Sequence, residues 1–337
     1  MRGSLQYKVM ILDVARYKFL EAVATLFILA LVVVFSGVLL PGGSMLEYSG
    51  GGAPLGVLVS ELQHSHRVIA SLLAFILTIH LSFGITRATI RSHLFVANSF
   101  ATMSIIPLVL LLFATSGATL LNICVVWLAV EAIRRIFFAF SSDRRHQAVF
   151  TAMLALGVMP LMDSSLFIVV CALPLLLISL RSSLGDMVIA TAGMVLPIFT
   201  YAYIVWCGGG EFVPTVEMFY ERMVAVAPLN VVESISMPQI IAGGVFTLLC
   251  ILSVVLYLRN SMSMLLATRH AWRFIISSTI LLVAAFVLLP SASLSMLLLV
   301  AVLVGITTPM LLLRLSTPIA MLLYLLLLGC AVMLLIA

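Results

Sequence analysis

Residues 147–206 decide the class of fold, and they read QAVFTAMLALGVMPLMDSSLFIVVCALPLLLISLRSSLGDMVIATAGMVLPIFTYAYIVW. Nearly every residue outside two short polar turns is apolar, so the segment is stable only where lipid surrounds it. The pattern predicts a helical hairpin that turns at Asp163, a polar link after Arg181, and a long helix that contains Pro197. Each arm of the hairpin has only about 17 apolar residues, near the lower limit for crossing a bilayer, so the hairpin either spans the membrane or is re-entrant.

The composition of the whole chain agrees with a membrane protein. Of its 337 residues 64% are hydrophobic and 9% are charged, whereas a soluble domain has about 25% charged residues. The formal net charge of +5 comes from basic residues in short loops between apolar runs, which membrane orientation requires and which does not indicate a nucleic-acid partner. The first apolar run, from Phe19, has no small-x-small cleavage site and predicts an uncleaved anchor.

The predicted fold is all-α, a polytopic transmembrane helix bundle of about 11 spans, or of about 9 spans and one re-entrant hairpin. Residues 1–18 are predicted to form a cytoplasmic surface helix, and residues 19–337 a single transmembrane helical domain. The outer-side loop at 207–237 has apolar residues at helical spacing, which predicts a surface helix that begins after Pro214 with Thr215 as its cap. Hydropathy places span two at about 55–86, span three at about 94–114 and span nine at 274–289.

Lysine and arginine set the orientation of such a bundle, because short loops that carry them stay in the cytoplasm. With this segmentation, all of the 17 Lys and Arg residues except Arg67 and Arg222 fall on one side. The N-terminus is then cytoplasmic and the C-terminus lies outside. Glu131 and Arg135, four residues apart at the inner end of span four, are expected to pair on one helix face. The residues expected to fix topology and structure are these two together with Asp163, Arg144, Arg145, Arg181 and Pro197.

From about residue 98 onward, the order of features resembles an uncharacterised family of polytopic inner-membrane proteins of Bacteroidota, a domain-of-unknown-function family. The resemblance is carried by residues 147–162, the arginine of LLLISLRSSLGD, the GMVLP of span seven and the ending VGITTPMLLLRLSTPIAMLLYLLLL. The family has no established activity to transfer. The resemblance implies a bacterial inner-membrane location and a role in cell-envelope biology.

One stretch, SELQHSHRVIASL, has the pattern of a cofactor motif. It resembles the Glu-x-x-His-Arg entry of a helix in haem A synthases, in which paired histidines on different helices coordinate haem. The resemblance implies Glu61, His64 and His66 as the positions concerned. The alternative is a polar helix end in the headgroup layer, with Gln63 and Arg67 four apart on one face. No other predicted helix offers a histidine on the outer side, so no haem cofactor is predicted.

Two further groups of ionisable residues are candidates for chemistry. His80 lies deep in predicted span two, where a lone histidine is more often hydrogen-bonded to a neighbouring helix than bound to a ligand. On the outer side, Glu47 and Glu211 are candidates for a general base or a metal ligand in a membrane transferase that uses a lipid-linked sugar. Solvated loop charge is the alternative for both, because no paired carboxylate spacing occurs.

The sequence contains no constellation of catalytic type, and its cytoplasmic face is basic. These features predict a non-enzymatic inner-membrane protein, either a carrier of an amphipathic envelope precursor or a subunit of an envelope assembly. Its expected partners are membrane lipid, a lipid-linked envelope precursor or another membrane protein. A membrane-embedded glycosyl or lipid transferase and a haem-binding protein are the alternatives.

Overall fold

A computed structural model of the chain describes residues 19–35, 53–95, 99–112, 119–140, 145–179, 184–224, 237–289 and 293–336. Within these ranges the chain is helical and has no strand, which confirms the all-α prediction. The predicted surface helix at 1–18 lies outside them. The elements are α1 (Phe19–Val34), α2 (Pro54–Ser65), α3 (Arg67–Arg91), α4 (Ala101–Leu112), α5 (Thr119–Ala139), α6 (Arg145–Met162), η3 (Ser164–Leu166), α7 (Phe167–Ser179), α8 (Leu184–Cys207), α9 (Phe212–Val224), α10 (Met237–Asn260), η4 (Ser261–Ser263), α11 (Leu266–Leu288), α12 (Leu294–Leu312) and α13 (Thr317–Ile336).

Five of these helices, α3, α8, α10, α11 and α12, are long and apolar enough to cross a membrane. Shorter apolar segments lie at 21–34, 101–112, 164–174 and 317–333. Large apolar side chains such as Leu248, Ile251 and Leu258 of α10 are exposed, as expected of a surface that faces lipid. The chain is therefore a helical membrane protein. The count of eleven spans and the side of each terminus stay predictions.

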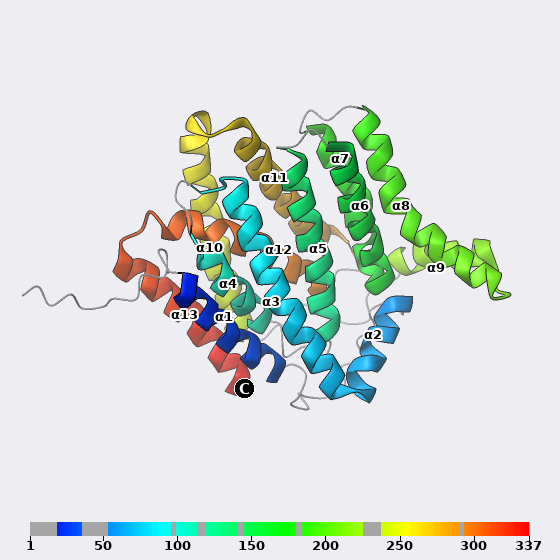
Figure 1. The fold of residues 1–337 in the computed structure, drawn as a ribbon, viewed down its shortest axis with the longest axis horizontal. Helices are drawn as coiled ribbons and strands as arrows, with labels where there is room; N and C mark the ends of the chain where they lie inside the picture. The colour runs from blue at the N-terminus through cyan, green and yellow to red at the C-terminus, as the bar shows by residue number, and fades with distance from the viewer. Residues whose placement is uncertain are drawn as a thin grey trace, which may run out of the picture.

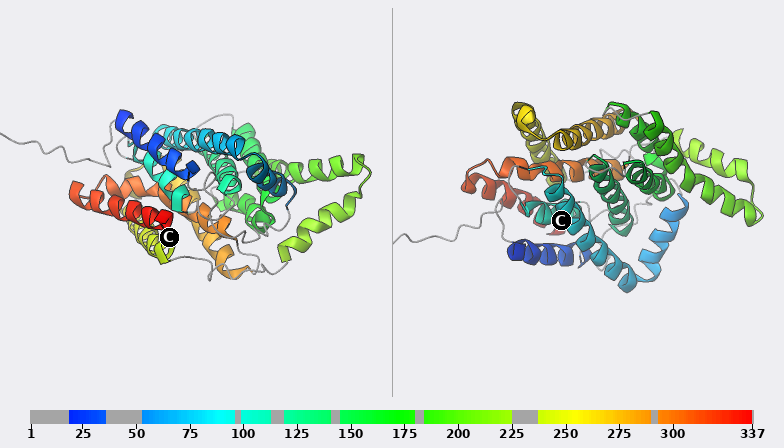
Figure 2. Two further views of the ribbon diagram at one scale, coloured as in Figure 1. Left: turned by 90° about the horizontal axis from the view of Figure 1, so that it is seen from below. Right: turned by 45° about the horizontal axis from the view of Figure 1, so that its top comes forward.

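The centre of the bundle is formed by α4 and α12. Every residue of α4 is buried, and so are 89% of residues 295–312 in α12. α12 packs against α4, α5, α10 and α11. Around this centre α5, α6, α7 and α8 stand side by side, α1 and α13 lie at one end of the elongated molecule, and α9 extends from the other end (Figures 1 and 2).

Two glycines allow α6 and α8 to approach each other closely. A Cβ atom at Gly157 of α6 would overlap the backbone oxygen of Met194 in α8, and one at Gly193 of α8 would lie 2.8 Å from the backbone oxygen of Phe150 in α6. Small residues at helix crossings are typical of membrane proteins, where helices associate through close van der Waals packing. The predicted hairpin and the helix after it are thus held together backbone against backbone.

Several polar contacts between distant parts of the chain lie at the two ends of the bundle. At the end where the arginines lie, the Thr268 hydroxyl donates to the backbone oxygen of Ser92 (3.0 Å), and the Trp272 indole donates to the backbone oxygen of Leu94 (3.1 Å). At the other end, the hydroxyl oxygens of Ser165 and Ser293 lie 2.7 Å apart and share a hydrogen bond. Each of these contacts joins segments that are far apart in the sequence.

The structure corrects the prediction that span two is one continuous helix. His66 has non-helical dihedral angles (φ −130°, ψ 63°), and it separates α2 from α3. The side chain of Gln63 is buried, and its Oε1 accepts a hydrogen bond from the backbone N–H of Leu120 (3.0 Å). The expected face shared by Gln63 and Arg67 is therefore wrong, because Gln63 joins α2 to the start of α5.

Three other predicted boundaries are also wrong. α4 begins at Ala101, later than the predicted start of span three, and α11 begins at Leu266, earlier than the predicted start of span nine. The helix in the 207–237 loop begins at Phe212, and the Thr215 hydroxyl donates to the backbone oxygen of Glu211 instead of capping the helix. Phe219 of α9 is buried against Leu161, Ile198 and Tyr201, so one side of α9 packs on protein.

Candidate functional site

Of the two acidic residues that were candidates for transferase chemistry, the structure describes Glu211 alone. Glu211 is exposed in the short connection between α8 and α9. Glu47 lies outside the described residues, as do the topology residues Arg144 and Arg181. Within the described part of the chain, no group of three or more His, Cys, Asp or Glu residues is arranged to hold a metal ion.

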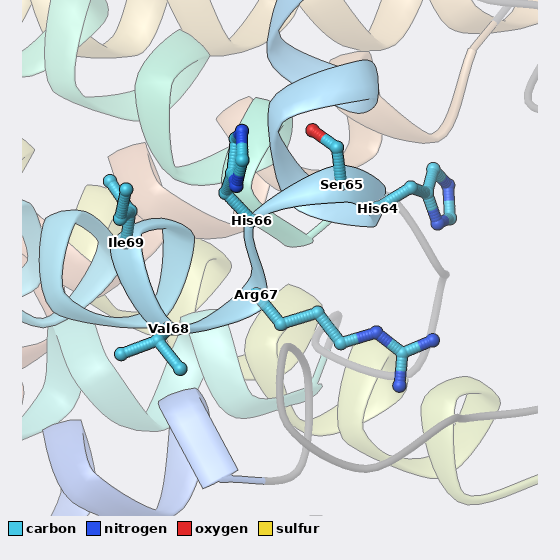
Figure 3. A pocket seen from close by; sticks show the side chains of 6 residues that line it. All are labelled: His64, Ser65, His66, Arg67, Val68 and Ile69. Carbon is cyan, nitrogen blue, oxygen red and sulfur yellow. The ribbon is translucent and has the colours of Figure 1, made fainter.

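The predicted cofactor stretch forms the corner between α2 and α3. A shallow hollow at this corner is lined by residues 64–69, and both His64 and His66 are exposed there. Figure 3 shows that the imidazole rings of His64 and His66 point in different directions. Glu61 is exposed one turn earlier in α2. These side chains do not converge on a common point, so the geometry offers no shared axial position for haem iron.

The predicted pairing of Glu131 with Arg135 is confirmed. Arg135 Nε lies 2.8 Å from Glu131 Oε1, and Arg134 Nη2 lies 2.7 Å from the same oxygen. The two guanidinium groups thus share one carboxylate about two turns before the end of α5. Arg134 was not predicted as a second partner. Its spacing of three residues from Glu131 could have indicated the contact, because residues three apart also share a helix face.

Arg145, which was expected only to fix topology, forms an ion pair with a buried carboxylate. Its Nε lies 3.2 Å from Oδ2 of Asp186 at the start of α8, and Nδ1 of His146 lies 2.8 Å from Oδ1 of the same residue. The Asp186 side chain is only 2% exposed. The cluster joins the beginnings of α6 and α8, which the sequence separates by about 40 residues, so spacing alone did not predict it.

Asp163 and Pro197 have structural roles. Asp163 Oδ1 accepts hydrogen bonds from the backbone N–H (3.1 Å) and the hydroxyl (2.6 Å) of Ser165, so it caps the 3-10 turn η3 and confirms the predicted turn of the hairpin. α8 continues through Pro197 to Cys207. Neither residue is placed to act on a substrate.

An apolar cavity of about 50 Å³ lies between α5, α6, α7, α11 and α12. Its walls come from the last turns of α6, the first turns of α7 and inner turns of the other three helices, and every lining residue except Ser278 is apolar. A cavity of this volume is large enough for water, but apolar walls give water too few partners, so such a cavity stays dry. The lining includes Ala132 and Ile133 of α5, Met159 of α6, Val170 of α7, Phe274 and Ser278 of α11, and Val302 of α12.

Ser278 is the only polar side chain of this lining, and it differs from the other hydroxyls of α11. Ser277 donates to the backbone oxygen of Arg273 (2.7 Å), and Thr279 donates to that of Ile275 (2.8 Å). The Oγ of Ser278 is buried and has no hydrogen-bond partner among the described residues. A buried polar group without a partner costs about 1–3 kcal/mol, so this hydroxyl favours an occupant that can accept a hydrogen bond.

His80 occupies the middle of α3, about 20 Å from its first residue. The indole N–H of Trp127 in α5 donates to His80 Nδ1 at 2.9 Å. The expectation that this histidine is bonded to a neighbouring helix is therefore confirmed. The His80 side chain is nevertheless exposed on the surface of the bundle.

Comparisons of the chain with protein families, with curated proteins and with solved structures find no match. The function must therefore be argued from the geometry. Of the features above, the apolar cavity is the one that is enclosed by several helices and has a hydrogen-bonding group without a partner. No sequence pattern marks it, because its walls combine apolar residues of five helices and such residues are common throughout the chain.

Proposed function

We propose that this chain is a non-enzymatic membrane protein that holds the apolar chain of an amphipathic lipid in the cavity between α5, α6, α7, α11 and α12. The cavity itself supports the proposal most directly: its walls come from five helices and are apolar, and its one hydroxyl lacks a partner among the described residues. By the resemblance of its sequence, we place the protein in a bacterial inner membrane, as a carrier or assembly subunit in cell-envelope biogenesis.

The energetics favour an occupied cavity. An apolar void destabilises a protein by about 24 cal/mol per Å³, so a cavity of about 50 Å³ costs about 1 kcal/mol when it is empty. The apolar walls of the cavity gain van der Waals contacts when the end of an alkyl or prenyl chain enters it. The cavity is too small for a whole lipid, so the headgroup and most of the chain must lie elsewhere.

Native mass spectrometry of the purified protein tests this proposal. We expect the wild-type protein, extracted in mild detergent, to retain one bound lipid. Ala132→Phe places a ring in the cavity and should remove that lipid, because Ala132 lines the cavity and is 1% exposed. Ile280→Phe is the matched control, since it adds a ring on the exposed face of α11.

Ala132→Val is a smaller change that keeps the test valid if the phenylalanine variant fails to fold. It should weaken lipid retention in part while the thermal midpoint stays the same or rises. A wild-type protein that is free of lipid, or equal retention in the Ala132 and Ile280 variants, would show that the cavity is a packing void.

Ser278 allows a second test of the chemistry of the occupant. An eighteen-carbon fatty acid with a mid-chain hydroxyl should compete for the cavity better than the unsubstituted acid. Ser278→Ala should remove that difference, because the alanine methyl group cannot donate or accept a hydrogen bond. If both acids compete equally well for the cavity of the wild-type protein, Ser278 has no part in binding.

A further inference from the structure

One face of α3 is exposed along its whole length. Ile69, Leu73, Ile76 and His80 lie on it at spacings of three or four residues, and all four are exposed. The same spacing continues to Gly84 and to the exposed Arg87. A Cβ atom at Gly84 would have nothing within 4 Å, so the backbone is open to a neighbour at that point.

The hydrogen bond from Trp127 determines what His80 presents on this face. His80 Nδ1 accepts the indole N–H at 2.9 Å, so the neutral ring carries its proton on Nε2. His80 is therefore a donor whose acceptor must come from outside the α3–α5 pair. A donor without a partner in the hydrocarbon region costs several kcal/mol, which favours a covered surface.

Arg87 adds a positive charge two turns further along the same face. It forms no ion pair with any described residue, and the nearest carboxylate on α5, Glu131, already accepts from Arg134 and Arg135. The face thus presents an apolar half, a donor at mid-depth, an open glycine and then an unpaired guanidinium. Each of these features has a complement in the side chains of a membrane helix.

We propose that this face of α3 is the docking surface for one transmembrane helix of a different membrane protein. That helix carries a hydrogen-bond acceptor opposite His80 and a carboxylate opposite Arg87, and it approaches most closely at Gly84. Small residues at such contacts and hydrogen bonds across helices are the usual means of association in membranes.

Two other occupants fit this face less well. A lipid has its oxygens at the interface and only hydrocarbon at mid-depth, so it has nothing to accept from His80. A second copy of this chain, related by a two-fold axis along the membrane normal, would place Arg87 against Arg87 and one His80 donor against another. Both arguments favour a partner of complementary chemistry.

Photocrosslinking in phosphatidylcholine vesicles tests the docking surface. The protein carries benzoylphenylalanine in place of Ile76 and is mixed with one of two synthetic leucine-alanine transmembrane peptides. One peptide has asparagine at its centre, to face His80, and glutamate two turns from the centre, to face Arg87. The other peptide has leucine at both positions. We expect the polar peptide to crosslink at least about fivefold more than the apolar one.

His80→Leu combined with Arg87→Leu should reduce crosslinking of the polar peptide to the level of the apolar one. The photoreactive residue at Ile251, on the exposed face of α10, is the control site and should show no preference. Equal crosslinking of both peptides at Ile76 would overturn the proposal. A crosslinked dimer of the protein would also overturn it and would assign the face to a second copy. Loss of the preference when anionic phosphatidylglycerol is added at constant ionic strength would assign the face to a lipid.

Discussion

Trp127 of α5 donates a hydrogen bond to His80 of α3 across the contact between the two helices. The indole N–H lies 2.9 Å from His80 Nδ1, and the centroids of the two rings are 6.2 Å apart. The bond fixes the tautomer of a histidine in the middle of α3, and it joins two helices that pack against each other. The α3 face and the packing of the bundle therefore depend on the same pair.

A double-mutant cycle should measure this bond. Trp127→Phe and His80→Leu each remove one partner, and we expect a coupling energy of about 0.6 kcal/mol in the free energy of unfolding, the average for hydrogen bonds between membrane helices. The measurement is reversible unfolding in mixed micelles of the wild-type protein, both single variants and the double variant. Strictly additive effects would mean that the two side chains do not interact.

The ion pair between Arg145 and Asp186 should contribute more to stability than a surface ion pair does, because the Asp186 carboxylate is buried although Arg145 is partly exposed. Arg145→Ala removes the guanidinium partner of a buried carboxylate that His146 also contacts, and we expect a loss of about 1–3 kcal/mol in the free energy of unfolding. Adding Asp186→Asn should recover part of the loss, because the neutral amide needs no counter-charge. If the double variant is less stable than Arg145→Ala alone, the ion pair is not the reason.

The close crossing of α6 and α8 makes a sharp prediction for glycine. Gly157→Ala would push a methyl group into the backbone of Met194 and should lower the thermal midpoint or prevent folding. Gly243→Ala is the control, because a Cβ atom there has nothing within 4 Å and alanine is the better helix former. The two variants are compared by thermal unfolding in detergent, and equal midpoints would contradict the crossing.

Reporter fusions test the predicted orientation. Fusions after Arg145 and Arg269 should report the cytoplasm, and fusions near Glu221 and at the C-terminus should report the outside. The physical reason is the cost of moving a guanidinium group through lipid, which is several kcal/mol. A cytoplasmic C-terminus would mean that the span count is wrong by one, and the short turns after residue 274 are where such an error would lie.

The sequence predicted the helical class, the hairpin turn at Asp163 and the pair of Glu131 with Arg135, because each depends on residues close together in the chain. It did not predict which helices form the centre. α4 and α12 are as apolar as the lipid-facing helices, so composition cannot tell burial in protein from burial in lipid. The hairpin at 147–181 decides the class of fold but lies beside that centre.

The break at His66 was missed for a related reason. No glycine or proline marks the break, and only the contact of Gln63 with the start of α5 shows why α2 turns away. The apolar cavity and the partners of Asp186 depend in the same way on residues that are far apart in sequence. Without a repeated spacing to mark them, they become visible only in three dimensions.

The most direct test of the central claim is to map where a lipid chain enters the protein. A polyprenyl phosphate with a diazirine at the end of its chain is incorporated into vesicles with the protein, irradiated, and located by peptide mass spectrometry. We predict that the label attaches to cavity residues such as Ile133, Met159 and Phe274, and that Ala132→Phe removes it from them. Label confined to outward-facing residues such as Ile251 and Ile280, and unchanged by Ala132→Phe, would contradict the claim that the cavity holds a lipid chain.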